Sequence, residues 1–172
     1  MHPLIREALE ITEDLGPVTF VGAVAVFLHT KNTRESQDLD FAIAKPITRE
    51  ELLDKQYRFI VENGKEKTYT PRNYKIDIYS DRPLNKIPIK TIIETSKDFE
   101  VDKKGHKVNA MGLEALVLAK FRANRPSQDY SDLRALAIQR LKQIDWKLLE
   151  KLSGNKTEFG DLKRTLEYIA KN

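Results

Sequence analysis

Two aspartates spaced two residues apart in an apolar, strand-like run place the strongest constraint on this chain. Asp38 and Asp40 open the stretch that ends at Ile43, and Asp77 lies between two isoleucines in a second such run, 74–79. Side chains at positions i and i+2 of a strand point to the same face, and aspartate is depleted in strand interiors. The pattern predicts two strands that carry acidic groups on one face.

Two explanations of these acidic positions remain open. A half-exposed antiparallel strand shows the same alternation, with its polar face in water. Alternatively, three neighbouring carboxylates repel one another unless a divalent cation neutralises them, and Mg²⁺ and Mn²⁺ prefer oxygen ligands. The second explanation predicts Mg²⁺ or Mn²⁺ held by Asp38, Asp40 and Asp77, and with it phosphate chemistry.

Composition narrows the class of protein. The 172 residues suit one domain with a normal core, and the absence of cysteine excludes disulfides, thiolate catalysis and cysteine-based zinc sites. The formal net charge of +4 has the right sign for a triphosphate or nucleic-acid partner, and it equally suits a soluble surface. No apolar run is long enough to span a membrane and no basic stretch leads into an apolar segment at the amino terminus, so we expect a cytoplasmic protein without a membrane partner.

The hydrophobic periodicity predicts an α+β fold in which a mixed sheet is flanked by helices and followed by a helical C-terminal part. We expect helices at 4–15, 23–29 and 48–62, the last opened by a capping box of Thr48 and Glu51. Strands are expected at 18–21, 38–44, 66–70, 74–79, 99–101 and 106–109, while 87–95 suits a strand or a short helix. Four helices follow, at 111–124, 127–143, 145–152 and 157–171. The division is therefore 1–108 for the core and 109–172 for the helical part, packed as one unit.

Gly22 ends the first predicted strand, and a helix is expected to begin directly after it. The unpaired N–H groups of a helix start bind anions without a side chain, so this position suits a phosphate. An ordinary turn glycine is the alternative.

These features together resemble the minimal nucleotidyltransferases of the DNA polymerase β superfamily, especially the small prokaryotic branch that includes toxin-like AbiEii proteins. The resemblance covers about residues 16–140. It rests on Gly22-Ala23, on Asp38-Leu39-Asp40 and on Asp77, with a later segment that contains Lys120, Asp129 and Asp132. Ala23 stands where the family usually has a second glycine or a serine, which removes a hydroxyl contact to the triphosphate. Gln128 stands where a basic residue commonly precedes the first acid of the last motif.

The resemblance implies a Mg²⁺-dependent transfer of a nucleoside monophosphate from an NTP to a hydroxyl of an RNA, a protein or a small molecule, as in a toxin-antitoxin component. Asp38, Asp40 and Asp77 then hold the metal, and Asp77 helps to accept the hydroxyl proton. A catalytically silent module of the same fold, binding a nucleotide or a partner protein, is the alternative. The intact aspartate set favours catalysis, whereas Ala23 favours the silent module.

The resemblance also implies phosphate contacts for four positions, namely Gly22, Ala23, Arg34 and Lys120. Lys120 is equally well explained as a surface lysine whose stem covers apolar neighbours, and Arg34 as a solvated loop arginine. Asp129 and Asp132 suit first the N-terminal turn of a helix, where negative charge is favourable. The tyrosines near the second acidic strand, Tyr69, Tyr74 and Tyr79, suit sheet packing better than stacking against a base.

Overall fold

The computed structural model describes all of the chain except residues 33–35 and 37. Within the described residues, seven strands form one mixed sheet in the order β3-β4-β5-β2-β1-β7-β6. The strands are β1 (Thr19–Phe20), β2 (Asp38–Ala42), β3 (Arg58–Glu62), β4 (Lys65–Tyr69), β5 (Lys75–Tyr79), β6 (Lys97–Glu100) and β7 (Lys107–Ala110). Pairs β2–β5 and β1–β7 are parallel and the other neighbours are antiparallel. The predicted α+β fold with a mixed sheet is confirmed.

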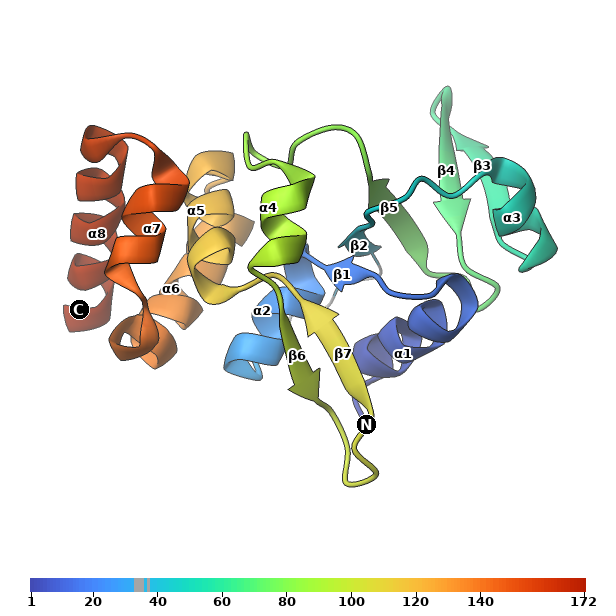
Figure 1. The fold of residues 1–172 in the computed structure, drawn as a ribbon, viewed down its shortest axis with the longest axis horizontal. Coiled ribbons are helices and arrows are strands. Elements are labelled where there is room, and N and C mark those ends of the chain that lie inside the picture. The colour runs from blue at the N-terminus through green and yellow to red at the C-terminus, as the bar shows by residue number, and fades with distance from the viewer. Residues whose placement is uncertain (33–35, 37) are drawn as a thin grey trace.

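Helices gather at the two ends of the sheet and over its middle (Figure 1). The helices are α1 (Pro3–Leu15), α2 (Gly22–Thr30), α3 (Arg49–Asp54), α4 (Ile89–Glu94), α5 (Leu113–Ala123), α6 (Gln128–Arg140), α7 (Trp146–Ser153) and α8 (Lys156–Lys171), with a 3₁₀ turn at Leu141–Gln143. Helices α5 to α8 form one end of the molecule, and α3 lies with the β3–β4 hairpin at the other. No helix in the described part of the chain is long and apolar enough to cross a membrane.

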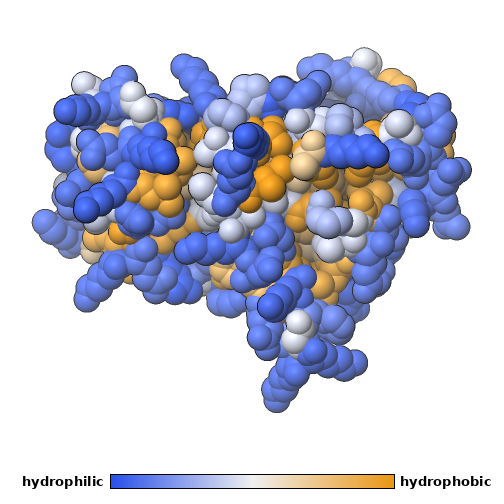
Figure 2. All heavy atoms as spheres, viewed as in Figure 1, coloured by the Kyte–Doolittle hydropathy of each residue, from blue (hydrophilic) through white to orange (hydrophobic). Residues whose placement is uncertain are grey.

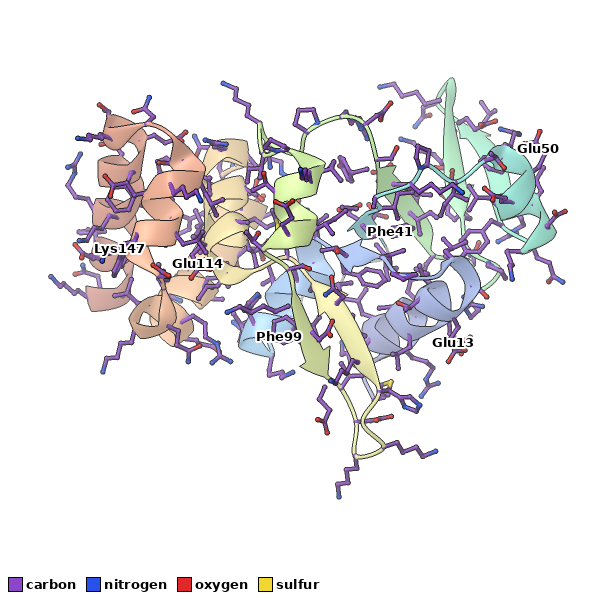
Figure 3. All side chains as sticks on the ribbon, viewed as in Figure 1. Glu13, Phe41, Glu50, Phe99, Glu114 and Lys147 are labelled. Carbon is purple, nitrogen blue, oxygen red and sulfur yellow. The ribbon has the colours of Figure 1, made fainter. Side chains whose placement is uncertain are left out.

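The hydrophobic core runs from α1 through the central strands to α5. Phe20 and Phe41 are fully buried on neighbouring strands and meet edge to face, with ring centroids 5.7 Å apart. Phe41 points into the interior (Figure 3). At the helical end, the buried Glu114 of α5 accepts a hydrogen bond from the backbone N–H of Asp145 at 2.9 Å and so ties α7 to α5. On the face shown in Figure 2, hydrophilic side chains predominate and apolar side chains show between them.

The helix expected at 48–62 is wrong in its second half. The capping box of Thr48 and Glu51 is present, but α3 ends at Asp54, and Gln56 has a left-handed backbone with φ of 64°. Residues 58–62 instead form β3, which pairs antiparallel with β4 through the turn at Asn63-Gly64. Both turn residues have positive φ, 50° and 73°, which is the conformation that joins two adjacent strands tightly. The Asn-Gly pair is therefore a hairpin signal rather than a helix stop.

The remaining predicted elements agree with the structure within two or three residues. The ambiguous segment 87–95 contains helix α4, and the hairpins 66–79 and 99–109 are the pairs β4–β5 and β6–β7. Strand β7 spans residues 108 and 109, where the sequence placed the division between the core and the helical part. The sheet is thus continuous through that point, and it pairs β7 with β1 next to the start of α2.

Candidate functional site

The acidic residues of β2 and β5 lie side by side on the sheet. The parallel register pairs Asp40 with Asp77 and Asp38 with Lys75. Partner residues of neighbouring strands project to the same face, so the three carboxylates share one side of the sheet, as the sequence predicted. Strand β2 pairs in parallel with β5 and antiparallel with β1. Asp38 and Asp77 are exposed, as on a solvated strand face, whereas Asp40 is partly buried and is not explained in that way.

Negative charge at this position is only partly compensated. Burial, together with the carboxylates of Asp77 and Asp38, raises the pKa of Asp40 to about 6 from its ordinary value of 3.8. The ammonium groups of Lys120 and Lys75 act in the opposite direction without cancelling the shift. A raised carboxyl pKa means that the ionised form is disfavoured here, so the site favours a cationic ligand.

Asp38 has a partner of its own within the protein. The ammonium of Lys75 donates a hydrogen bond to Oδ2 of Asp38 at 2.8 Å. Among the described residues, no three acidic or histidine side chains are arranged so that they could hold a metal ion together. The oxygen donors of Asp40 and Asp77 nevertheless suit Mg²⁺ or Mn²⁺, and their mutual repulsion is the feature that such a cation relieves.

The start of α2 approaches the acidic pair closely. Val21 donates its backbone N–H to the carbonyl of Asp40 at 2.9 Å, and the N-terminus of α2 has no side-chain cap. Gly22 has φ of 57°, and a Cβ added there would lie 2.9 Å from Oδ2 of Asp40. Gly22 is therefore required by both its backbone and its neighbour, which makes it more than an ordinary turn glycine. Ala23 packs against the hydrophobic core.

A cleft of about 410 Å³ opens in front of these groups. Its polar lining comes from the sheet, from the start of α2, from the turn after β5 and from the helical end of the molecule. The lining residues include Gly22, Asp38, Asp40, Asp77, Tyr79, Asn85, Lys120, Arg125 and Asp129, and Ala23 is not one of them. The structure thus brings together every predicted site residue that it describes except Ala23, while Arg34 lies outside the described residues.

The helical wall of the cleft is built on an ion-pair cluster. Lys120 is 5% exposed, and its Nζ lies 3.2 Å from Oδ1 of Asp129 and 2.6 Å from Oδ2 of Asp132. Nε of Arg125 lies 2.8 Å from the other oxygen of Asp129. Burial alone would raise the pKa of Asp129, but hydrogen bonds from Arg125 and Lys120 lower it. All four charged groups are therefore satisfied within the protein.

This cluster corrects two interpretations of the sequence. Lys120 is not a surface lysine, because it is buried between α5 and α6. Asp129 does lie in the first turn of α6, as expected for a helix start. However, Asp129 and Asp132 are 0% and 4% exposed, and they act chiefly as the counter-ions of Lys120 rather than as solvated charges at a helix end.

Sequence reasoning missed three residues that shape the site. Lys75 is the partner of Asp38, and Arg125 pairs with Asp129 at the mouth of the cleft. Asn85 lines the cleft, and its carbonyl accepts a hydrogen bond from Arg122 at 3.1 Å. The position of Lys75, two residues before Asp77 on the same face of a strand, was the available signal. Arg125 and Asn85 lie in loops without a motif.

Of Tyr69, Tyr74 and Tyr79, Tyr79 is the tyrosine that lines the cleft. Its ring centroid lies 4.7 Å from the guanidinium of Arg82. Burial, together with the charges of Asp40 and Asp77, raises the pKa of its hydroxyl. Tyr69 lies outside the cleft and donates a hydrogen bond to Glu62 at 2.6 Å.

Comparison with known proteins gives evidence on the fold. No protein-family model and no curated protein sequence matches the chain. The solved structures that are similar include the following three. A lincosamide antibiotic adenylyltransferase, LnuA, determined with lincomycin bound, has a TM-score of 0.57 at 18% identity over 79% of this chain and 96% of its own. JHP933 from Helicobacter pylori has a TM-score of 0.53 at 17% identity over 98% and 89%. An antigenic nucleotidyltransferase-like protein from Paracoccidioides brasiliensis has a TM-score of 0.53 at 12% identity over 91% and 92%. The chain therefore has the fold of nucleotidyltransferase-like proteins.

Proposed function

We propose that the protein transfers a nucleoside monophosphate from an NTP to a hydroxyl group, with Mg²⁺ or Mn²⁺ as the cofactor. The observation that carries this proposal is the pairing of Asp40 with Asp77 in parallel register, directly beside the uncapped start of α2. A cation site next to a set of free helix N–H groups is suited to a metal-bound polyphosphate. The nucleotidyltransferase-like fold supports the same conclusion.

The charged residues of the sheet and the start of α2 would have different roles in this reaction. Asp38, Asp40 and Asp77 would hold the metal. The backbone N–H groups at the start of α2 would donate to the β- and γ-phosphates, because Gly22 lets the chain approach without a side chain. The acceptor oxygen forms a bond to the α-phosphorus, the bond to pyrophosphate breaks, and the carboxylate of Asp77 accepts the hydroxyl proton. When bound, the metal would neutralise the triphosphate and stabilise the departing pyrophosphate.

The helical wall places the guanidinium of Arg125 at the other side of the cleft. The side chain of Arg125 is 62% exposed, and it lies in the lining of the cleft. Its guanidinium would contact the phosphates while Asp129 holds its position. Lys120 is buried in the same cluster and its ammonium is already bound by two carboxylates, so it would act by holding Asp129, and through Asp129 the guanidinium of Arg125, in position.

The acceptor hydroxyl belongs to an RNA, a protein or a small molecule. One structural neighbour is an antibiotic adenylyltransferase bound to lincomycin, which favours including small-molecule acceptors in the assay. A role as a toxin-antitoxin component corresponds to an RNA or protein acceptor. Ala23 favours a second candidate, a silent module that binds nucleotide without transfer, because no hydroxyl is present at that position.

Transfer of label is the direct test. Each of the four NTPs, labelled at the α-phosphate, is incubated with the protein, Mg²⁺ or Mn²⁺ and one acceptor class at a time: total RNA, a protein extract, or a panel of hydroxyl-bearing small molecules. We expect label on one acceptor class with one preferred NTP. Asp40→Asn should abolish the transfer, and Asp54→Asn, which removes an exposed aspartate of α3, should leave it unchanged.

Two results separate the candidate functions. Nucleotide binding in the presence of metal, without transfer to any acceptor class, would establish the silent module. In that case Ala23→Ser tests whether the missing hydroxyl is the reason. Failure of both binding and transfer would refute both candidates.

A further inference from the structure

Lys75 is the one basic side chain of β2 and β5 that lies within the acidic face, and its position is fixed by the strand register. It stands opposite Asp38, one pair along from the pair of Asp40 and Asp77. Its Nζ is 2.8 Å from Oδ2 of Asp38. The ammonium of Lys75 is therefore already bound to Asp38, the outermost of the three carboxylates.

The two side chains of this ion pair are exposed to different extents. The side chain of Lys75 is 25% exposed, whereas that of Asp38 is 50% exposed, so the lysine is the more covered partner. The hydrogen bond to Asp38 raises the pKa of Lys75, and the charge of Asp77 adds to this effect. The carboxylates of Asp38 and Asp77 thus both stabilise the ammonium of Lys75.

Strand pairing does not need this ion pair. Strands β2 and β5 share five paired positions, and Leu39 and Ile76 are 0% and 2% exposed in the core between them. A partly exposed ion pair adds little to such an interface. The contact of Lys75 with Asp38 is thus better explained by what it does to the acidic face.

We propose that Lys75 is a built-in counter-ion that holds Asp38 until a divalent cation displaces it, and that it thereby sets the cation concentration at which the site loads. This inference rests on the proposed function, because it takes the three aspartates as the cation ligands. It accounts for the finding that no three acidic side chains of the described residues form a ready metal site. Asp38 joins Asp40 and Asp77 as a cation ligand once its hydrogen bond to Lys75 is broken.

The test is a titration of the apo protein with Mn²⁺, in which free Mn²⁺ is measured by electron paramagnetic resonance. Lys75→Met should lower the Mn²⁺ concentration at half-saturation by roughly twofold to fivefold, the range expected when a partly exposed ion pair no longer competes. Lys65→Met removes an exposed lysine from the adjacent strand β4 and serves as the matched control, with no change expected. Lys75→Gln is a second variant should the methionine variant fold poorly.

A double-variant cycle isolates the contact itself. In an Asp38→Asn background, Lys75→Met should no longer change the half-saturation, because the carboxylate that the lysine holds is gone. A persistent effect in that background would mean that Lys75 acts on the site only through its general field, which would overturn the proposal.

The outcomes distinguish this proposal from the proposed function. If wild-type protein binds Mn²⁺, Asp40→Asn abolishes that binding, and Lys75→Met binds no more tightly than Lys65→Met, then the inference fails and the cation site stands. Weaker binding by Lys75→Met would likewise overturn it. If Asp40→Asn leaves Mn²⁺ binding intact, the cation lies elsewhere, and the metal assignment of the proposed function fails together with the inference.

Discussion

The cleft has a sheet wall, formed by β2 and β5, and a helical wall, formed by α5 and α6 with the loop between them. Both walls contain charged residues, but their charges are compensated to different extents. On the sheet wall, three carboxylates share one ammonium, that of Lys75, and the pKa of Asp40 is raised. On the helical wall, Lys120 and Arg125 are matched by Asp129 and Asp132, and the pKa of Asp129 is lowered. Among the described residues, carboxylates outnumber ammonium groups on the first wall, whereas the positive and negative groups of the second wall are equal in number.

This difference separates the charged groups that would bind a ligand from the charged groups that stabilise the fold. Removing one member of a buried ion pair strongly destabilises a protein, because the other charge is left buried without compensation. Removing one of several repelling carboxylates has the opposite effect on stability. The same substitution type should therefore cost activity on the sheet wall and stability on the helical wall.

The largest expected effect is on activity at the sheet wall. Asp40→Asn and Asp77→Asn should each reduce label transfer by on the order of 10³-fold or more, because positioned charges that stabilise the transition state supply much of the rate enhancement in such reactions. Each variant should be as stable as wild type or more stable in urea unfolding. A large loss of stability in either variant would show that the sheet wall is structural and would break the comparison.

The next largest effect is on stability at the helical wall. Lys120→Met should lower the free energy of unfolding by about 3 kcal/mol, because the two buried carboxylates of Asp129 and Asp132 both lose the cation that lies between them. Urea unfolding measures this directly. Lys90→Met, which removes a lysine whose side chain is 84% exposed, is the control and should change stability little. Equal stabilities for the two variants would contradict the structural role of Lys120.

The sheet wall could be predicted from sequence because it depends on local periodicity. A spacing of two residues puts Asp38 and Asp40 on one face whatever the partner strand is, and the flanking isoleucines mark Asp77 as a strand residue. The partnership of Lys75 with Asp38 was not predictable in this way. It depends on the parallel register of β2 and β5, which joins positions 37 residues apart.

The helical wall was harder to predict because its chemistry depends on how two helices pack. Lys120 and Asp132 lie on different helices, so their contact follows from the crossing of α5 and α6 and not from a pattern in either. The wrong helix at 48–62 has a related cause. Its apolar residues suit either period over a short run, and the Asn63-Gly64 turn decides in favour of a hairpin.

Substitution of Gly22 should affect both the backbone at the start of α2 and the acidic pair of Asp40 and Asp77. Gly22→Ala should destabilise the protein by about 1–2 kcal/mol through its left-handed φ alone, and further because the new Cβ would lie 2.9 Å from Oδ2 of Asp40. Gly154→Ala is the matched control. Gly154 has φ of 63° and nothing within 4 Å of its ideal Cβ, so thermal or urea unfolding of both variants isolates the cost of the Asp40 contact. If Gly22→Ala is no more destabilising than Gly154→Ala, the acidic pair is not held against α2 as closely as described.

The smallest effect is the pH dependence that Asp40 gives to stability. Its pKa rises from 3.8 when unfolded to about 6 when folded, so between these values the folded protein binds more protons than the unfolded chain. Stability should therefore fall as the pH rises from about 4 to 6, by about 1 kcal/mol after screening of a partly exposed group. Urea unfolding of wild type and Asp40→Asn across this range measures the difference, and the variant should lack this contribution. Saturating Mg²⁺ should shrink it in wild type, because a bound cation favours the ionised carboxylate. A difference between the two proteins that stays flat with pH would mean that the sheet wall does not carry the uncompensated charge on which the comparison depends.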